Sequence, residues 1–167
     1  MVQTLEPKIV KLLNEFFTQT QQCAKAIRLK QPQPYGGYQD CDILVLGRGK
    51  YNLAIECKSV LEPSNQKIYF KSYFTTDKQG RHQIPRMTEF CSLTGLTGIL
   101  VVELRSGVKN SWHEVYFVPW RVVNALFVNG VGGITYDEVR KWPRFERTKG
   151  TVNLDECLTA IRYDIDE

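Results

Sequence analysis

The chain has 167 residues, of which 43% are hydrophobic and 24% charged, and these values fit a single globular domain with a sizeable core. No apolar run is long enough for a transmembrane helix, and the N-terminus lacks the pattern of a signal peptide, so we expect a cytoplasmic protein with no membrane association. A net charge of +4 and a sequence pI near 8.8 are compatible with a polyanionic partner without being diagnostic of one. The five cysteines show no CxxC spacing, and only His82 and His113 could complete a zinc site with them. This pattern argues against zinc and for reduced, mostly buried thiols.

The first forty residues predict a helix, a strand and a loop, in that order. Apolar side chains recur at helical spacing over residues 5–17, and residues 23–29 alternate in the manner of a strand. Residues 31–40 contain two prolines and two glycines and cannot be helical. We therefore expect an irregular loop that leads directly into Asp42.

The next two apolar runs predict a β-hairpin. Both runs, which together span residues 42–58, are rich in β-forming residues, and the connector between them contains two glycines. Side chains alternate along a strand, so Glu56 and Lys58 share one face while Cys57 points to the other. Pairing of the two strands can bring Asp42 close to the face that carries Glu56 and Lys58. The hairpin therefore predicts two carboxylates and one ammonium group within a small space.

These charges have two explanations, a solvated surface or a metal site. Alternating charges along an amphipathic strand often form only a solvated outer face. Here the neighbouring residues are almost all apolar, and a charge at the end of a buried strand is costly unless it is paired or binds a metal. We therefore interpret Asp42 and Glu56 as ligands of Mg²⁺, for which Mn²⁺ can substitute. The backbone carbonyl of Cys57 can be a further ligand, and Lys58 can orient a water or balance charge.

The remainder of the chain predicts further strands and helices around this hairpin. Strands are expected over 67–74, 98–103 and 115–118, and helices over 83–94, 119–125 and 153–162, with a short helix after the capping residue Thr135 that ends before Pro143. This order predicts an α/β (α+β) fold with a central mixed β-sheet that is flanked by helices and has the hairpin at its centre. We divide the chain into a core, residues 1–125, and a C-terminal extension, residues 126–167, packed on the same domain.

The aspartate at the start of one strand and the Glu-x-Lys triplet at the end of the next resemble the PD-(D/E)xK nuclease superfamily. The matching segments are residues 42–45 and 56–59. The chain departs from the pattern at Cys41, where the family often has proline or another apolar residue. Asp40 is a rival for the aspartate role, although Asp42 is better placed at the edge of the strand.

Within that superfamily the chain is most similar to the archaeal-type Holliday junction resolvases. Glu6 precedes a Leu-Leu pair in the first helix, and Gln83 precedes a helix that contains a Glu-Phe pair at residues 89–90. A strand that ends in residues 117–120 is also similar to theirs. The resemblance covers roughly residues 4–125.

The resemblance implies a restriction-endonuclease-like core and a magnesium-dependent endodeoxyribonuclease. Its substrate would be a four-way junction or other branched DNA in recombination and repair, and it would act as a homodimer. The resemblance also implies that Glu6 lies at the metal and that Gln83 lies near the metal-bound water, beside the catalytic residues Asp42, Glu56 and Lys58. Without the resemblance, Glu6 is simply an acid favoured by the helix dipole, and Gln83 is a surface residue.

Basic residues cluster between the Glu-x-Lys strand and the next predicted helix, at Lys67, Lys71, Lys78, Arg81 and Arg86. Such a cluster is often only a solvated face, but beside a nuclease centre it would form a track for phosphates. We predict DNA contacts at Lys67, Lys71, Arg81 and Arg86. Two other functions stay open: a different PD-(D/E)xK nuclease, of restriction type or of a viral or mobile-element repair type, and a catalytically inactive DNA-binding protein of the same fold.

Overall fold

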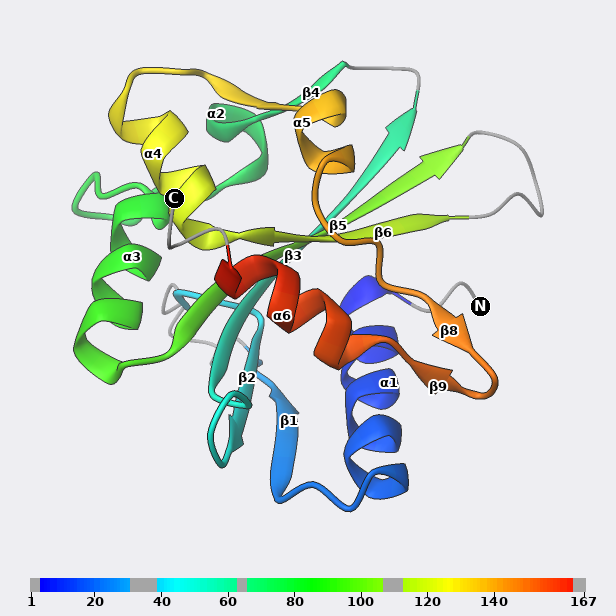
Figure 1. Ribbon diagram of the computed structural model, residues 1–167. Helices are drawn as coiled ribbons and strands as arrows, with labels where there is room; N and C mark the ends of the chain where they lie inside the picture. Colours follow the sequence, from blue (N-terminus) through cyan, green and yellow to red (C-terminus); the bar gives the residue numbers. More distant parts are fainter. Residues whose placement is uncertain (1–3, 31–38, 63–65, 107–112, 164–167) are drawn as a thin grey trace.

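The computed structural model describes residues 4–30, 39–62, 66–106 and 113–163, which form a central β-sheet with helices on both faces (Figure 1). The helices are α1 (Leu5–Gln19), α2 (Phe70–Tyr73), α3 (Gln83–Thr94), α4 (Trp120–Val128), α5 (Tyr136–Arg140) and α6 (Leu154–Tyr163). The strands are β1 (Ala24–Arg28), β2 (Ile43–Gly47), β3 (Leu53–Glu62), β4 (Lys67–Tyr69), β5 (Thr97–Ser106), β6 (Glu114–Pro119), β7 (Gly133–Thr135), β8 (Arg147–Thr148) and β9 (Thr151–Val152).

The main sheet is mixed and has the strand order β1-β2-β3-β5-β6. Neighbouring strands are antiparallel except for β3 and β5, which run parallel over ten residue pairs. The connection from β3 to the parallel strand β5 carries α3, as a parallel crossover requires. The predicted α/β fold with a central mixed sheet flanked by helices is therefore confirmed, and β3 of the predicted hairpin is its middle strand.

The two faces of this sheet pack against different helices. On one face, α1 and α6 contribute Ile9 and Leu158 to a core that includes Ile55 of β3. On the other face, α3 and α4 contribute Met87 and Val123. Because side chains alternate along β3, residues 56 and 58 belong to the face that α3 covers.

The described residues after position 125, 126–163, contribute to the cores on both faces of the main sheet. Strand β7 pairs with β4 in a separate two-stranded sheet, and the third residue pair of that sheet joins Tyr69 to Gly133. Helix α5 starts as predicted, since the Thr135 hydroxyl accepts a hydrogen bond from the backbone N–H of Glu138 at 3.1 Å. Helix α6 lies across the α1 face (Figure 1).

The predicted strand over residues 67–74 is wrong in its second half, because only Lys67–Tyr69 is a strand and Phe70–Tyr73 is a helical turn. Phe70 and Phe74 are both buried and their rings lie 5.8 Å apart edge to face. One helical turn places two residues at this spacing on the same side, whereas a strand that continued to residue 74 would hold them further apart.

Two broader expectations concern the cysteines and the membrane. All five cysteines are free, as predicted. Among the helices of the described residues, none combines the length and the apolar character needed to cross a membrane.

Gly98, at the start of β5, provides a test of this packing. A Cβ added there would lie 2.6 Å from the Cβ of Trp120 and 3.1 Å from the Sγ of Cys91. We expect Gly98→Ala to lower the free energy of unfolding by about 1–3 kcal/mol, because α3, which carries Cys91, and α4, which carries Trp120, would have to shift. Urea denaturation measures this loss. Gly132→Ala is the matched control, since its Cβ would meet nothing within 4 Å, and equal losses in the two variants would contradict the packing.

Candidate active site

The β2–β3 hairpin brings Asp42 next to the Glu-x-Lys triplet. The backbone N–H of Asp42 donates to the carbonyl of Ile55 at 2.9 Å, which extends the ladder beyond the first residue of β2. The Asp42 Oδ2 in turn accepts a hydrogen bond from the backbone N–H of Cys57 at 2.9 Å. The side chain of Asp42 is thus fixed against the backbone between Glu56 and Lys58, where the hairpin was predicted to bring it.

Glu56 is the most deeply buried carboxylate of this group, with 3% of its surface exposed. Its Oε1 is paired with the Nζ of Lys58. Its Oε2 is buried and has no hydrogen-bond partner among the residues that the structure describes. Burial raises the pKa of Glu56 to about 7, against the attraction of Lys58; the nearby charge of Asp42 raises it further and a polar contact with Gln83 lowers it.

The pKa of Asp42 is also subject to opposing effects. Burial raises the pKa of its carboxyl, whereas the hydrogen bond from Cys57 and the charge of Lys58 lower it. The negative charge of Glu6 acts in the raising direction, and Gln39 donates a hydrogen bond to Oδ1 at 3.3 Å. Both carboxylates of the hairpin therefore lie where negative charge is incompletely compensated.

Lys58 supplies the positive charge of the site. Only 14% of its side chain is exposed, and its Nζ lies 4.8 Å from the ring centroid of Phe74 while it pairs with Glu56. An ammonium group over an aromatic face is stabilised by the ring quadrupole. The amine is therefore held between the aromatic ring and the carboxylate.

Gln83 and Glu6 approach the hairpin from the two helical layers. Gln83, the first residue of α3, is 4% exposed; its Oε1 accepts from the backbone N–H of Thr75 at 3.3 Å, and its Nε2 donates to the carbonyl of Asp40 at 3.5 Å. Glu6 lies in the first turn of α1, and its Oε2 is 4.0 Å from a guanidinium nitrogen of Arg28. Gln83 thus packs inside the site, whereas Glu6 lies at its margin and acts on Asp42 through charge.

Arg86 anchors the segment that leads into Asp42. Its side chain is 4% exposed and lies 3.1 Å from the carboxylate of Asp40 and 3.8 Å from that of Asp77. It also donates to the Thr75 hydroxyl at 3.2 Å. Asp40 is therefore paired with Arg86, while Asp42 faces the Glu-x-Lys triplet. This arrangement favours Asp42 over Asp40 as the aspartate of the predicted site.

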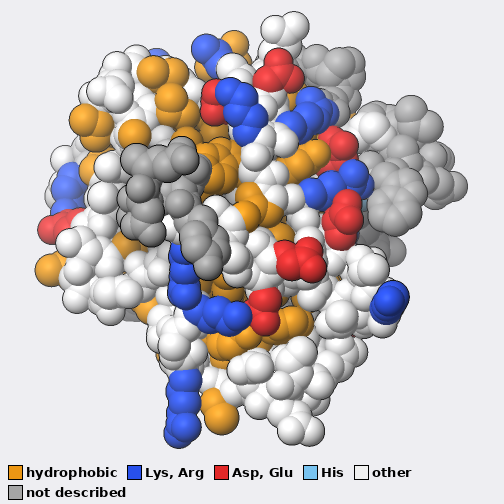
Figure 2. All heavy atoms as spheres, viewed as in Figure 1, with side chains coloured by type: hydrophobic (Ala, Val, Ile, Leu, Met, Phe, Trp, Pro, Cys, Tyr) orange, Lys and Arg blue, Asp and Glu red, His pale blue; other side chains and the backbone are white. Residues whose placement is uncertain are grey.

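The four basic residues predicted to contact DNA have different surroundings. Arg86 is the buried anchor just described, and its burial does not favour a phosphate contact. Lys71 is exposed on α2, and Lys67 lies over the ring of Tyr69 at 5.0 Å. Arg81 is 61% exposed and pairs with Asp77 and Glu89. On the face shown in Figure 2, basic and acidic side chains are interspersed.

The donor set determines which metal ion the site could hold. Within the described part of the chain, no three His, Cys, Asp or Glu side chains lie together as a metal-binding group, so a closed structural zinc site has no support there. Asp42 and Glu56 offer two carboxylates, one with the buried, unpartnered Oε2, and the Cys57 carbonyl is a further oxygen donor. Burial and the nearby carboxylates raise the pKa of the Cys57 thiol well above its usual value, which disfavours a thiolate ligand. Two carboxylates with waters suit Mg²⁺, which keeps part of its hydration shell.

Sequence reasoning missed several residues around this centre. Gln39, Phe74 and Arg28 contact the predicted residues, and none was assigned a role. The burial of Arg86 had a signal, because residues 83, 84, 86 and 87 follow the spacing of one helix face. Gln39 had none, since it lies in a polar loop whose course depends on tertiary contacts.

The chain is similar to solved structures. No protein-family model and no curated protein matches the chain in sequence. Among solved structures it is similar to Hjc from Archaeoglobus fulgidus, a Holliday junction resolvase from an archaeal hyperthermophile. The two chains are 16% identical, the match covers 88% of this chain and 80% of that one, and the TM-score is 0.41.

Glu56 should make the stability of the metal-free protein depend on pH. Its pKa of about 7 in the folded state lies above the ordinary value of 4.5, so the folded protein holds this proton more tightly than the unfolded chain does between these values. The free energy of unfolding should therefore fall as pH rises through this window. Relative to Glu56→Gln, wild type should lose stability between about pH 5 and pH 8, measured by urea denaturation in EDTA. Parallel profiles for the two proteins would contradict the assignment.

Arg86 should contribute to folding more than its exposed neighbour does. We expect Arg86→Met to lower the free energy of unfolding by about 3–5 kcal/mol, because its removal leaves carboxylates without their buried partner. Arg81→Met is the matched control, since Arg81 pairs with the same Asp77 but is 61% exposed, and its loss should have little effect. Urea denaturation compares the two, and equal small losses would refute the anchoring role.

Proposed function

We propose that this chain is a metal-dependent endodeoxyribonuclease of the PD-(D/E)xK type that hydrolyses phosphodiester bonds in branched DNA. The observation that carries the proposal is the buried Glu56 carboxylate beside the fixed carboxylate of Asp42. One Glu56 oxygen is paired with Lys58, and the other has no hydrogen-bond partner among the described residues. A buried carboxylate oxygen without a partner is costly, and binding of a cation is a common reason to keep one. An inactive scaffold gains nothing from this arrangement.

Each residue of the site has a task in this reaction. Asp42 and Glu56 would hold a divalent cation, Mg²⁺ or Mn²⁺, together with the carbonyl of Cys57. When bound, such an ion activates water and stabilises charge on a phosphate. Lys58 keeps its amine at the same place and can orient the water or offset charge on the scissile phosphate. Gln83, buried beside Glu56, can donate a hydrogen bond within the site, and Glu6 can add negative charge at its margin.

The substrate is proposed from the resemblance together with the basic surface. Lys67, Lys71 and Arg81 are partly or fully exposed on the segments that follow β3, where they can contact phosphates. A four-way junction needs two symmetric cuts, and a two-fold homodimer would supply two centres. Recognition would then depend on DNA shape and backbone contacts and not on base sequence.

The test is cleavage of a labelled four-way junction and a matched linear duplex, with Mg²⁺ or EDTA. We expect symmetric nicks near the branch point that require Mg²⁺, and a loss of about a hundredfold or more in Asp42→Asn, since one charge at the reacting centre is removed. Asp137→Asn, at an exposed position on α5, is the matched control and should cut like wild type.

Other outcomes assign the chain elsewhere. Cleavage of the linear duplex in preference to the junction would keep the chemistry and indicate a restriction-type or repair nuclease. Tight binding without cleavage under any metal would indicate a DNA-binding protein without catalysis. Cleavage that survives Asp42→Asn would refute the site.

A further inference from the structure

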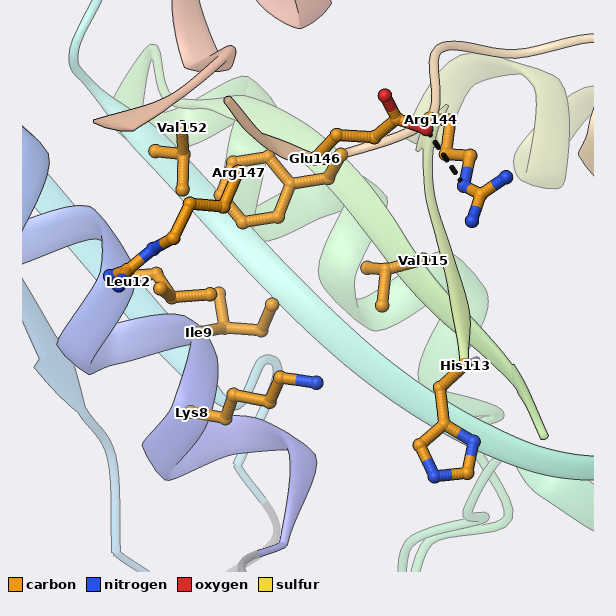
Figure 3. A pocket seen from close by; sticks show the side chains of 10 residues that line it. Lys8, Ile9, Leu12, His113, Val115, Arg144, Glu146, Arg147 and Val152 are labelled. Carbon is orange, nitrogen blue, oxygen red and sulfur yellow. Dashed lines mark ion pairs between the residues drawn. The ribbon is translucent and has the colours of Figure 1, made fainter. Parts of the chain in front are cut away.

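A cavity of about 630 Å³ lies on the α1 side of the sheet, on the face opposite to Glu56. Helix α1, the start of β6, residues 144–147 and β9 form its walls (Figure 3). Cavities of about 300–1,000 Å³ with mostly apolar walls are typical of small-molecule sites. No residue of the candidate active site lines this cavity.

The apolar walls are fixed by the core and by the C-terminal segment. Ile9, Val115 and Phe145 line the cavity and are also members of the α1-side core. Phe145 stacks on Phe117 with ring centroids 4.7 Å apart, and its backbone N–H donates to the carbonyl of Val115 at 2.7 Å. The hydrophobic surface of the cavity is therefore preformed and does not depend on a mobile side chain.

The β8–β9 wall is tied down by polar contacts. The side chain of Asn153 accepts from the backbone N–H of Glu146 at 2.7 Å and donates to the carbonyl of Arg144 at 2.9 Å. Arg147 forms an ion pair with Glu15 of α1 across the cavity rim. The C-terminal segment thus closes one side of a space that α1 and the sheet alone would leave open.

Of the basic side chains that line the cavity, Lys8 has no counterion among the described residues. Arg144 is paired with Glu146 at 3.0 Å, and Arg147 is paired with Glu15. Lys8 has no ion-pair partner within residues 4–30, 39–62, 66–106 and 113–163. Figure 3 shows Lys8 reaching from α1 toward the side where His113 lies, whereas Arg144 is turned to Glu146.

We propose that this cavity binds a small organic anion whose aromatic or aliphatic body lies against Leu12, Val115 and Phe145 and whose acidic group pairs with Lys8. One net cation beside a preformed apolar wall fits an amphipathic anion, which gains from both contacts. A nucleic-acid backbone fits less well, because both arginines here are already neutralised and the walls are apolar. This site is independent of the nuclease proposal and assigns residues 144–152 a role as one wall.

The experiment uses the full chain in EDTA without DNA, so that its result does not depend on nuclease activity. The probe is 2-naphthoate, with the neutral 2-naphthamide as its partner, followed by backbone amide chemical shifts. We expect saturable one-to-one binding of 2-naphthoate, with shifts in α1 around Lys8 and in residues 144–152. The neutral amide should bind about tenfold more weakly, because it lacks the charge-assisted contact.

Two variants assign the charge to Lys8. Lys8→Gln should weaken 2-naphthoate about tenfold and leave 2-naphthamide unchanged. Lys11→Gln, one turn along the same helix and outside the cavity, should change neither. Absence of 2-naphthoate binding at millimolar concentration, equal affinity for the two probes, shifts confined to other surfaces, or displacement of the probe by a short single-stranded oligonucleotide at lower concentration would overturn the proposal.

Discussion

The Glu56 carboxylate lies in the middle strand of the main sheet, and the surrounding residues compensate only part of its charge. Lys58 pairs with one oxygen, and the other oxygen is buried with no hydrogen-bond partner in the part of the chain that the structure describes. Burial outweighs the attraction of Lys58 and raises the pKa of Glu56 to about 7. A carboxylate in this state destabilises the fold at neutral pH unless something else compensates it. This uncompensated charge is the basis of the proposed metal site.

The second constraint is that α3 fixes the segment leading into β2. Arg86 holds the carboxylate of Asp40, and Gln83 contacts the carbonyl of the same residue while its own oxygen accepts from Thr75. Asp42 follows two residues later and is fixed in turn by the backbone of Cys57. Side chains that act together need supports that hold their geometry, and here one helix face and one hairpin supply them.

Local sequence was sufficient to predict the β2–β3 hairpin but not the short strands around it. The alternation around Glu56 and the glycines of the turn encode β2 and β3 within a short stretch, so pattern alone predicted their pairing. The strands β7, β8 and β9 are each only two or three residues long. Strand β7 pairs with β4, which lies more than sixty residues earlier in the chain. Strands this short show no alternating pattern in the sequence, because they form through pairing with partner strands.

The net negative charge around Asp42 and Glu56 would repel an approaching phosphate. Asp42 and Glu56 carry up to two negative charges, and Lys58 offsets one of them. Glu6 adds another charge at the margin, which Arg28 only partly offsets at 4.0 Å. A DNA backbone brought to the site would therefore be repelled unless a divalent cation reversed the local charge. The exposed cation Lys71 can attract a polyanion to the neighbouring surface, but it lies outside the cluster of buried carboxylates. In the proposed reaction, attraction of DNA and its productive approach to the carboxylates would be separate steps, and the second would depend on the metal.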